Sequence, residues 1–596
     1  MRKNIFALFI LLVLSGFSSV NATNIQYSLK MPKPQNHYFE VEMLIEDYKE
    51  ATLEVKMPVW APGSYLVREF AKNVNLVKAF DEKGNALTVI KTNKNTWKIQ
   101  KGTAKSVKVK YEVYSFELSV RTSFLDLTHG YVSGTGVFMY VENHQENKGQ
   151  LVVYPYSGFK KISTALPKAK EGMASDGAET FEFANYDQLV DCPIEIGNHI
   201  EFSFQSAGVN HRVAMYGDGN FDVEQLKKDM AKITATATQV IGENPNKEYL
   251  FIVHNVVDGQ GGLEHINSTT LSVNRWTYQG GEYIGFLSLV AHEYFHLWNV
   301  KRIRPVELGP FNYDEENYTS LLWVMEGFTS YYDELLLLRA GYYNQEQYIQ
   351  KVLSGLNYVE GSEGSRVQPV AHASFDAWIK SYRPNENSSN TTMTYYSRGG
   401  LLAAVLDAKI VTKFNGKKSL DDFMQKLYQD FYKKLNRGFS EAEFQKALSD
   451  FMEEDMSAFF RDYVNDTKVP DYKSIFAPVG LKVEYIGNAK PSFGASFSQS
   501  NGKAMVKAIR VNSAAENAGL SVNDEVIGFN GYRVEAGDLD GIFAGLTPGE
   551  SINLLISRDD VLLEIKAIMG SYERPTYKMT FDNNEKTLKL RNYWLR

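Results

Sequence analysis

The sequence is poor in the residues that build disulfides and thiolate metal sites, since its 596 residues include a single cysteine, Cys192. No disulfide can form within one chain, and a bound metal must rely on His, Asp or Glu side chains. We expect Cys192 to be a small buried side chain near a domain junction. Basic residues are not in excess either, because 64 Lys and Arg face 71 Asp and Glu. This balance argues against a protein that binds nucleic acid.

Long apolar runs are missing after the first residues of the chain. Arg2 and Lys3 precede the apolar run Ile5–Leu14, and the small-residue site Val20-Asn21-Ala22 follows it. This order is typical of a cleavable export signal, predicted at residues 1–22, and an uncleaved anchor is the alternative. Because no later segment is apolar over a spanning length, we expect a soluble chain without a transmembrane span, located in the periplasm or outside the cell.

Residue patterns predict a multidomain fold. The composition, 44% hydrophobic and 23% charged, excludes disordered and fibrous proteins. From about 24 to 198, apolar and polar residues alternate, as in Val107–Val113, which indicates a β-sandwich. Around residue 225 the period becomes helical, with a strand at Tyr249–Val257, which indicates an α/β region. Beyond Asn317 the chain is predicted to be helical, including one helix over Tyr318–Arg339, and a β-rich module follows from Val479 to Gly570.

One predicted helix, Gly285–Asn299, carries a metal-binding pattern. It contains His292-Glu293-Tyr294-Phe295-His296, in which the two histidines are four residues apart. Because four residues turn a helix by about 400°, both imidazoles lie on one face and can share one zinc ion. Glu293 lies at the flank of this face, where it can act as a general base on a water molecule. An apolar stripe on the opposite face anchors the helix: Leu287, Val290, Tyr294 and Trp298.

A catalytic zinc ion usually takes three protein ligands and keeps one open position. Glu326, 30 residues after His296, opens a run on the next strong helix that ends at Asp333. We predict Glu326 as the third ligand. Asp333 lies seven residues on, about 20° from the same helical face, and is predicted to accept the second N–H of a ligand histidine. A solvated acidic helix face is the alternative interpretation of this pair.

The C-terminal β-rich module resembles a bacterial PDZ domain. Ala504–Ile509 is predicted as a strand, Ser513–Leu520 as a short helix closed by a glycine, and Asp524–Gly531 as a strand ending in an Asn-Gly turn. The resemblance implies a groove that binds the C-terminus of a peptide by β-augmentation. The alternative is a structural lobe that packs against the catalytic domain.

The motifs together resemble one peptidase family. The stretch Ala291–Pro305, with Met325-Glu326-Gly327-Phe328 and the PDZ-like module, resembles the glycyl aminopeptidase family of gluzincin (thermolysin-like) zinc metallopeptidases. After the signal peptide, the resemblance implies an N-terminal β domain at 23–205 and a thermolysin-like α/β zinc peptidase domain at 206–475, helical from about 317. A PDZ-like domain at 476–572 and a C-terminal extension at 573–596 complete the expected order.

The resemblance also implies two substrate-binding elements. Gly261-Gly262-Leu263-Glu264-His265 stands where related aminopeptidases carry Gly-x-Met-Glu-Asn, which implies that Glu264, with Gly261 and Gly262, binds the free α-amine of the substrate. Leu263 and His265 depart from that motif. Tyr396-Ser397-Arg398-Gly399 resembles a Tyr-Glu-Lys-Gly segment, which implies that Tyr396 stabilises the tetrahedral intermediate. The adjacent Tyr395 is the alternative.

The sequence therefore predicts an exported aminopeptidase with one Zn²⁺ per chain, acting on peptides with a free N-terminus. By the resemblance, the residues it removes are small ones such as Gly or Ala. Two alternatives stay open. One is a zinc endopeptidase that uses the same site, and the other is a non-catalytic protein that binds peptides through the PDZ-like module. N-acetylated and free peptides distinguish the first alternative, because blocking the α-amine would stop an aminopeptidase.

Overall fold

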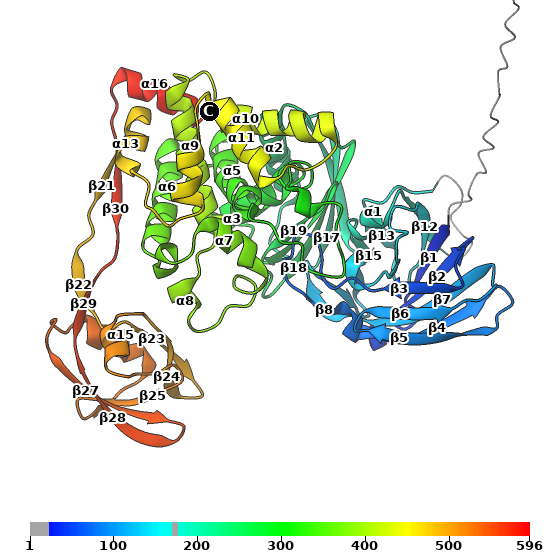
Figure 1. Ribbon diagram of the computed structural model, residues 1–596, viewed down its shortest axis with the longest axis horizontal. Helices are drawn as coiled ribbons and strands as arrows, with labels where there is room; N and C mark the ends of the chain where they lie inside the picture. Colours follow the sequence, from blue (N-terminus) through cyan, green and yellow to red (C-terminus); the bar gives the residue numbers. More distant parts are fainter. Residues whose placement is uncertain (1–22, 170–176) are drawn as a thin grey trace, which may run out of the picture.

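The structure, a computed structural model, describes residues 23–169 and 177–596. The predicted export signal at 1–22 lies outside these residues. Three parts follow one another along the chain in Figure 1: a β-rich N-terminal domain, a central α/β and helical domain, and a small C-terminal β domain. None of the helices in the described ranges combines the length and apolar character that crossing a bilayer requires.

Alternating apolar side chains build the N-terminal domain as two packed sheets. The larger sheet has ten strands, in the order β11-β3-β6-β5-β4-β7-β2-β1-β12-β14, and the smaller has five, β13-β15-β10-β9-β8. Side chains from both sheets share one hydrophobic cluster, so the predicted sandwich forms as expected. The strands of the larger sheet are β1 (Asn24–Lys30), β2 (Tyr38–Glu46), β3 (Thr52–Lys56), β4 (Val74–Asp81), β5 (Ala86–Asn93), β6 (Thr96–Gln100), β7 (Ser106–Tyr114), β11 (Tyr140–Val141), β12 (Gly149–Tyr154) and β14 (Glu179–Phe183). Those of the smaller sheet are β8 (Phe116–Ser119), β9 (Thr122–Leu125), β10 (His129–Val132), β13 (Lys161–Thr164) and β15 (Ile194–Gly197), and the short helix α1 (Tyr186–Val190) precedes β15.

The central domain begins with a five-stranded sheet in the order β16-β17-β18-β20-β19. Its first strand, β16, starts at Ile200, before the predicted domain boundary at 205. Among the described strands, β16 pairs with β17 only. The strands are β16 (Ile200–Ser206), β17 (Val209–Tyr216), β18 (Glu248–Val256), β19 (Gly262–Glu264) and β20 (Ser268–Asn274). β19 is an edge strand that pairs antiparallel with β20.

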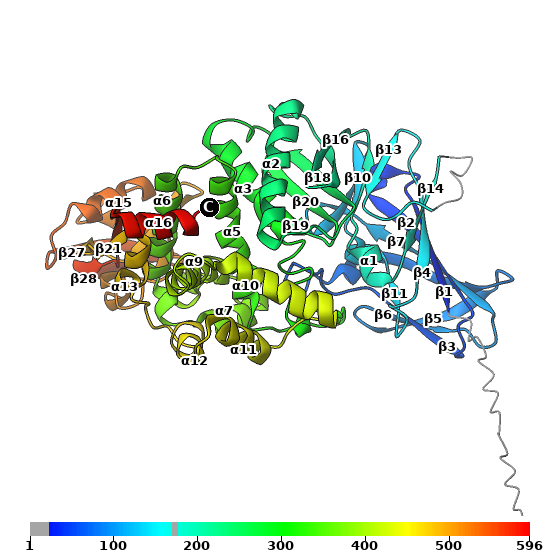
Figure 2. The same cartoon turned by 90° about the horizontal axis from the view of Figure 1, so that it is seen from above.

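Helices cover this sheet and form the rest of the domain. α2 (Val223–Ile241) and α3 (Gly280–Phe295) lie against the sheet in Figure 2, and α5 (Gly327–Arg339) packs between α3 and α9 (Tyr395–Lys413). α3 starts and ends earlier than the predicted helix, and His296 forms its C-terminal cap. The remaining helices are α4 (Leu322–Met325), α6 (Gln345–Glu360), α7 (Val370–Phe375), α8 (Ser388–Thr391), α10 (Leu420–Leu427), α11 (Glu441–Met452), α12 (Ser457–Phe459) and α13 (Tyr472–Phe476).

The C-terminal domain is connected to the central domain by two narrow ribbons. β21 (Leu481–Tyr485) pairs with β30 (Tyr577–Phe581), and β22 (Ala489–Ser492) pairs with β29 (Gly570–Glu573), so the chain leaves and returns side by side (Figure 1). The predicted C-terminal extension contains β30 and α16 (Glu585–Trp594), and Trp594 is buried in the core of the central domain. The C-terminal domain itself consists of β23 (Ala495–Ser500), β24 (Lys503–Ile509), α14 (Ala514–Asn517), β25 (Glu525–Phe529), β26 (Tyr532–Arg533), α15 (Ala536–Ala544), β27 (Ser551–Arg558) and β28 (Val561–Ile568).

Candidate metal centre and peptide cleft

Helix α3 presents His292, Glu293 and His296 to a cleft at the end of the central sheet. The opposite face of the helix is anchored in the core, where the predicted stripe, Leu287, Val290, Tyr294 and Trp298, is fully buried. The two imidazole rings are 4.7 Å apart between centroids and nearly perpendicular. Their Nε2 atoms point toward the same carboxylate, that of Glu326.

Glu326 occupies the point where the predicted continuous helix over Tyr318–Arg339 is interrupted. α4 ends at Met325 and α5 begins at Gly327, so the expectation of one helix was wrong. The reason lies in Asn299, whose side-chain amide donates to the backbone oxygens of Val324 and Met325 at 2.9 Å and diverts both from the helical ladder.

Close packing of two glycines fixes this interruption against α9. A Cβ on Gly327 would lie 2.4 Å from the Cα of Gly399, so no larger residue fits there. Glu326 Oε2 lies 3.3 Å from His296 Nε2 and 3.6 Å from His292 Nε2. Three donors from two segments 30 residues apart in the chain therefore meet, as predicted from the sequence.

The other nitrogen of each imidazole is held by a neighbour. His292 Nδ1 is 2.9 Å from Asp333 Oδ2, and His296 Nδ1 is 2.7 Å from the backbone oxygen of Asn299. Because Nδ1–H donates to these oxygens, the Nε2 lone pairs are left to face the metal position. Asp333 thus lies where the sequence predicted it. The part played by Asn299 was missed, since nothing in its spacing marks it.

The donor set fits a tetrahedral Zn²⁺ ion. Bonds of about 2.0–2.1 Å at tetrahedral angles place neighbouring ligand atoms about 3.3 Å apart. The two separations from Glu326 Oε2, 3.3 and 3.6 Å, match this value. One carboxylate and two neutral imidazoles are also the donor types that zinc takes in catalytic sites.

Burial and charge set unusual pKa values around this centre. Burial favours the neutral acid of Glu326, but without a metal the two imidazoles, when protonated, outweigh burial and lower its pKa to about 2. Burial raises the pKa of Glu293 to about 7, although the same imidazoles favour its charged form. Two adjacent carboxyl groups therefore have opposite tendencies, one to stay ionised as a ligand and the other to exchange a proton.

Glu293 faces the edge strand β19 across a very short distance. A Cβ on Gly262 would lie 2.3 Å from the carboxyl carbon and Oε1 of Glu293, so any larger residue there would displace the Glu293 carboxyl group. The other oxygen, Oε2, is buried and has no hydrogen-bond partner in the described part of the chain. Gly261, with φ of 104°, supplies the backbone conformation that leads into the strand.

Glu264, at the end of β19, points into the same cleft. Its carboxylate, that of Glu293 and a nitrogen of His296 offer donor atoms that all lie within 4.8 Å of one another. Glu264 is 4% exposed, and its Oε1 has no hydrogen-bond partner among the described residues. Gly63 of the N-terminal domain closes this end of the cleft, because a Cβ there would lie 2.5 Å from Glu264 Oε1. No residue pattern marks this contribution of the N-terminal domain.

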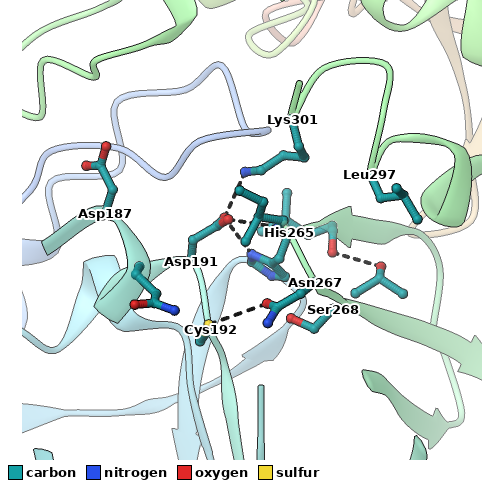
Figure 3. Close-up of polar contacts among 12 residues, drawn as sticks. Asp187, Asp191, Cys192, His265, Asn267, Ser268, Leu297 and Lys301 are labelled. Carbon is teal, nitrogen blue, oxygen red and sulfur yellow. Dashed lines mark hydrogen bonds and ion pairs between the residues drawn. The ribbon is translucent and has the colours of Figure 1, made fainter. Parts of the chain in front are cut away.

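His265 points away from the cleft, into the junction between the two domains. Figure 3 shows its ring beside Asp191, which also binds Lys301; His265 Nδ1 lies 3.0 Å and Lys301 Nζ 2.8 Å from Asp191 Oδ1. Burial opposes ionisation of Asp191, but these partners lower its pKa to about 2. Cys192 is buried beside it, with Sγ 3.7 Å from Asn267 Oδ1, at the junction where it was expected. The hydrogen bond between His265 and Asp191 ties the end of β19, and thereby Glu264, to the N-terminal domain.

Tyr396 lines the cleft with the metal-binding residues, and its ring stacks 6.3 Å from that of His292. Tyr395 is fully buried behind it, and its hydroxyl has no hydrogen-bond partner in the ranges described. Tyr382 and Tyr65 complete a wall of four tyrosines near Glu326, and neither was singled out from the sequence.

A second cluster of donors lies outside the cleft, between the two domains. His129 Nδ1 is 2.7 Å from Glu195 Oε1, and His254 Nε2 is 2.9 Å from Glu195 Oε2, with all three side chains fully buried. These distances are those of hydrogen bonds, so the Glu195 carboxylate bridges the two imidazoles. The cluster joins β10 and β15 to β18 and takes no part in the cleft.

Comparison with known families agrees with this architecture. The model of the Peptidase M61 N-terminal domain matches residues 26–198, and that of M61 glycyl aminopeptidase matches residues 285–402. Two separate segments of the chain therefore match models of M61 peptidases, in agreement with the predicted resemblance to the glycyl aminopeptidase family. A PDZ domain model also matches residues 491–568, which confirms the predicted order of a β domain, a peptidase domain and a PDZ domain.

Solved structures include one that is similar over nearly the whole chain. An aminopeptidase N family protein from Idiomarina loihiensis has 28% sequence identity and a TM-score of 0.87, over 96% of this chain and 100% of that chain. An M1 zinc metallopeptidase from Deinococcus radiodurans has 12% identity and a TM-score of 0.49, over 75% of this chain and 95% of that one. Yeast LTA4 hydrolase has 12% identity and a TM-score of 0.49, over 75% and 68% of the two chains. A comparison with curated proteins found no match.

Proposed function

We propose that this protein is a zinc aminopeptidase that removes small N-terminal residues, such as Gly or Ala, from peptides. The observation that carries the proposal is the buried Glu264 carboxylate, which has an unpartnered oxygen beside Glu293 and His296. A carboxylate there can hold the ammonium of a substrate next to the metal centre. Gly63 supports an exopeptidase, because its backbone lies against Glu264 and leaves little room for residues that would precede the substrate's N-terminus.

Each group of residues in the cleft has a separate role in the proposed reaction. Zn²⁺ held by His292, His296 and Glu326 would supply a Lewis acid for the scissile carbonyl. The free Oε2 of Glu293 takes a proton from the attacking water and returns it to the leaving amine. The Tyr396 hydroxyl donates a hydrogen bond to the developing oxyanion, a contribution of about 3 kcal/mol for a well-placed donor.

Two substrates and one variant test this proposal. Purified zinc-loaded protein is given Gly-Ala and N-acetyl-Gly-Ala, and we expect acetylation to lower kcat/KM by about 10²-fold or more, because it removes the charge that Glu264 binds. Glu293→Gln should keep its metal and lose about 10²–10⁴-fold in kcat. Glu282→Gln, an exposed glutamate on the same helix, is the matched control. Equal cleavage of both peptides would instead indicate an endopeptidase.

The PDZ domain contains a candidate for a second peptide-binding site. A cavity of about 670 Å³ lies between β23 and α15, lined by Phe493, Gly494, Asp540 and Phe543, and residues of α8 in the central domain also line it. We propose that it holds the C-terminus of a peptide by β-augmentation. Binding of a labelled peptide acid but not of its C-terminal amide would support this role.

We also propose that the protein is exported after removal of residues 1–22. The charged, apolar and small-residue segments of the N-terminus support this. Mass spectrometry of the protein from the host envelope should find a mature chain that starts at Thr23. A chain that keeps Met1 in the cytoplasm would refute it.

A further inference from the structure

The outer edge of β19, which is not paired with another described strand, lies beside the metal centre. β19 pairs only with β20 among the described strands, and the backbone oxygen of Gly261 accepts from Ser272 N on that side at 2.9 Å. Since successive carbonyls of a strand point to opposite sides, the oxygen of Gly262 faces the cleft. If Glu264 holds the amine, as proposed above, an extended peptide pairs antiparallel with β19 and runs from Glu264 toward Gly262.

Arg121, from the turn between β8 and β9 of the N-terminal domain, lies at the outer edge of β19. Its Nη2 donates to the oxygen of Gly262 at 3.3 Å, and its Nη1 lies 4.0 Å from the place of a Cβ on Gly261. The side chain lines the same cavity as the metal-binding residues. Within the described ranges Arg121 has no carboxylate partner within 4 Å, and its buried Nε has no hydrogen-bond partner.

A second guanidinium without an ion-pair partner, that of Arg68, adds to the positive charge around Arg121. Arg68 donates only to Ser64 Oγ, at 3.0 and 3.3 Å, and it forms no ion pair in the part of the chain described. Burial lowers the pKa of Arg68, and the charge of Arg121 lowers it further, while Glu117 and Tyr382 act weakly in the opposite direction. Two guanidinium groups that repel each other are stabilised by a nearby anion, and a carboxylate can accept two hydrogen bonds from one of them.

The distance along β19 between Glu264 and Gly262, whose oxygen is bonded to Arg121, identifies the anion. Glu264 and Gly262 are two residues apart on β19, which is about 6.6 Å along an extended strand. An extended dipeptide places its amine and its terminal carboxylate about two residues apart as well. We propose that Arg121 binds the terminal carboxylate of a dipeptide whose α-amine is held by Glu264, so that free dipeptides are the preferred substrates of this cleft. The inference rests on the aminopeptidase function proposed above.

The test compares peptides that differ only in their carboxylates. For the full-length zinc-loaded protein we expect kcat/KM for Gly-Ala to exceed that for Gly-Ala-NH₂ by about 30-fold, mainly through KM, because the amide removes a charge-assisted contact. Arg121→Met should bring the ratio close to one, and Arg121→Lys, which keeps the charge, should retain part of it. Arg383→Met, an exposed arginine whose Nη2 bonds Val67 O at 3.4 Å, is the matched control and should keep the full ratio.

A binding measurement makes the outcome independent of turnover. Calorimetry with Glu293→Gln should give tighter binding of Gly-Ala than of Gly-Ala-NH₂, and the difference should disappear when Arg121→Met is added. Equal affinities would overturn the inference, and so would a preference for Gly-Asp-NH₂ over Gly-Ala, which would assign Arg121 to an acidic side chain. Cleavage of acid and amide alike, with N-acetyl-Gly-Ala resistant, would refute the dipeptide preference and leave the aminopeptidase function standing.

Discussion

Gly262→Ala should damage catalysis by displacing one carboxyl group. A Cβ at this position would lie 2.3 Å from Cδ and Oε1 of Glu293 and 2.5 Å from its Cγ. Since carbon atoms in contact are separated by about 3.5–4.0 Å, Glu293 or the strand must move by more than about 1 Å. A misplacement of about 1 Å can cost about 10²-fold in rate. We therefore expect kcat to fall by about 100-fold, equal to about 2.7 kcal/mol in the activation barrier.

The assay for this variant separates positioning from folding. kcat for Gly-Ala, zinc content and melting temperature are measured together, and the zinc content should stay at one equivalent because Glu293 is not a proposed ligand. Gly281→Ala is the matched control, since a Cβ there meets nothing within 4 Å. If Gly262→Ala kept kcat within about threefold of the wild type, the close approach of β19 to Glu293 would not matter for the reaction.

Three further changes test separate parts of the structure. Asp333→Asn should weaken zinc affinity by about 10–100-fold, measured by competition with a chelator, because His292 loses its charged partner. Glu195 has a folded-state pKa of about 2 against an ordinary 4.5, because its two histidine partners outweigh burial. Ionised Glu195 therefore contributes about 3 kcal/mol to the free energy of unfolding above pH 4.5, and this contribution is lost as the pH falls toward 2. Glu195→Gln should make the free energy of unfolding less dependent on pH in this range. Trp594→Ala should destabilise the central domain by about 3–5 kcal/mol, seen in thermal denaturation, because the indole is fully buried.

The sequence was sufficient for residues that lie close together on one element or follow a known spacing. His292, Glu293 and His296 share one helical turn, so helix geometry alone brings them to one face. Glu326 and Asp333 could be inferred because a metal centre needs a third ligand and a partner for its histidines. The structure brings these residues together at 2.9 to 3.6 Å.

Residues that act from another domain could not be inferred in this way. Gly63 and Arg121 reach the cleft from the N-terminal domain, about 200 and 140 residues before β19, and no local periodicity reports such a contact. The helix interruption at Glu326 was missed because its cause, the Asn299 amide, is a side chain from a distant turn. Likewise β16 was placed with the wrong domain, since its alternation is the same as that of the preceding strands.

The most direct test of the central claim is the zinc content of the purified protein and of one variant. After dialysis against metal-free buffer, the wild type should hold one zinc ion per chain, and Glu326→Ala should hold less than about 0.1 while keeping its fold, because a catalytic site needs three protein ligands. The matched control is Glu334→Ala, an acidic residue on helix α5, which follows Glu326, and it should bind zinc as the wild type does. A Glu326→Ala protein that retains a full equivalent of zinc would contradict the proposed metal centre.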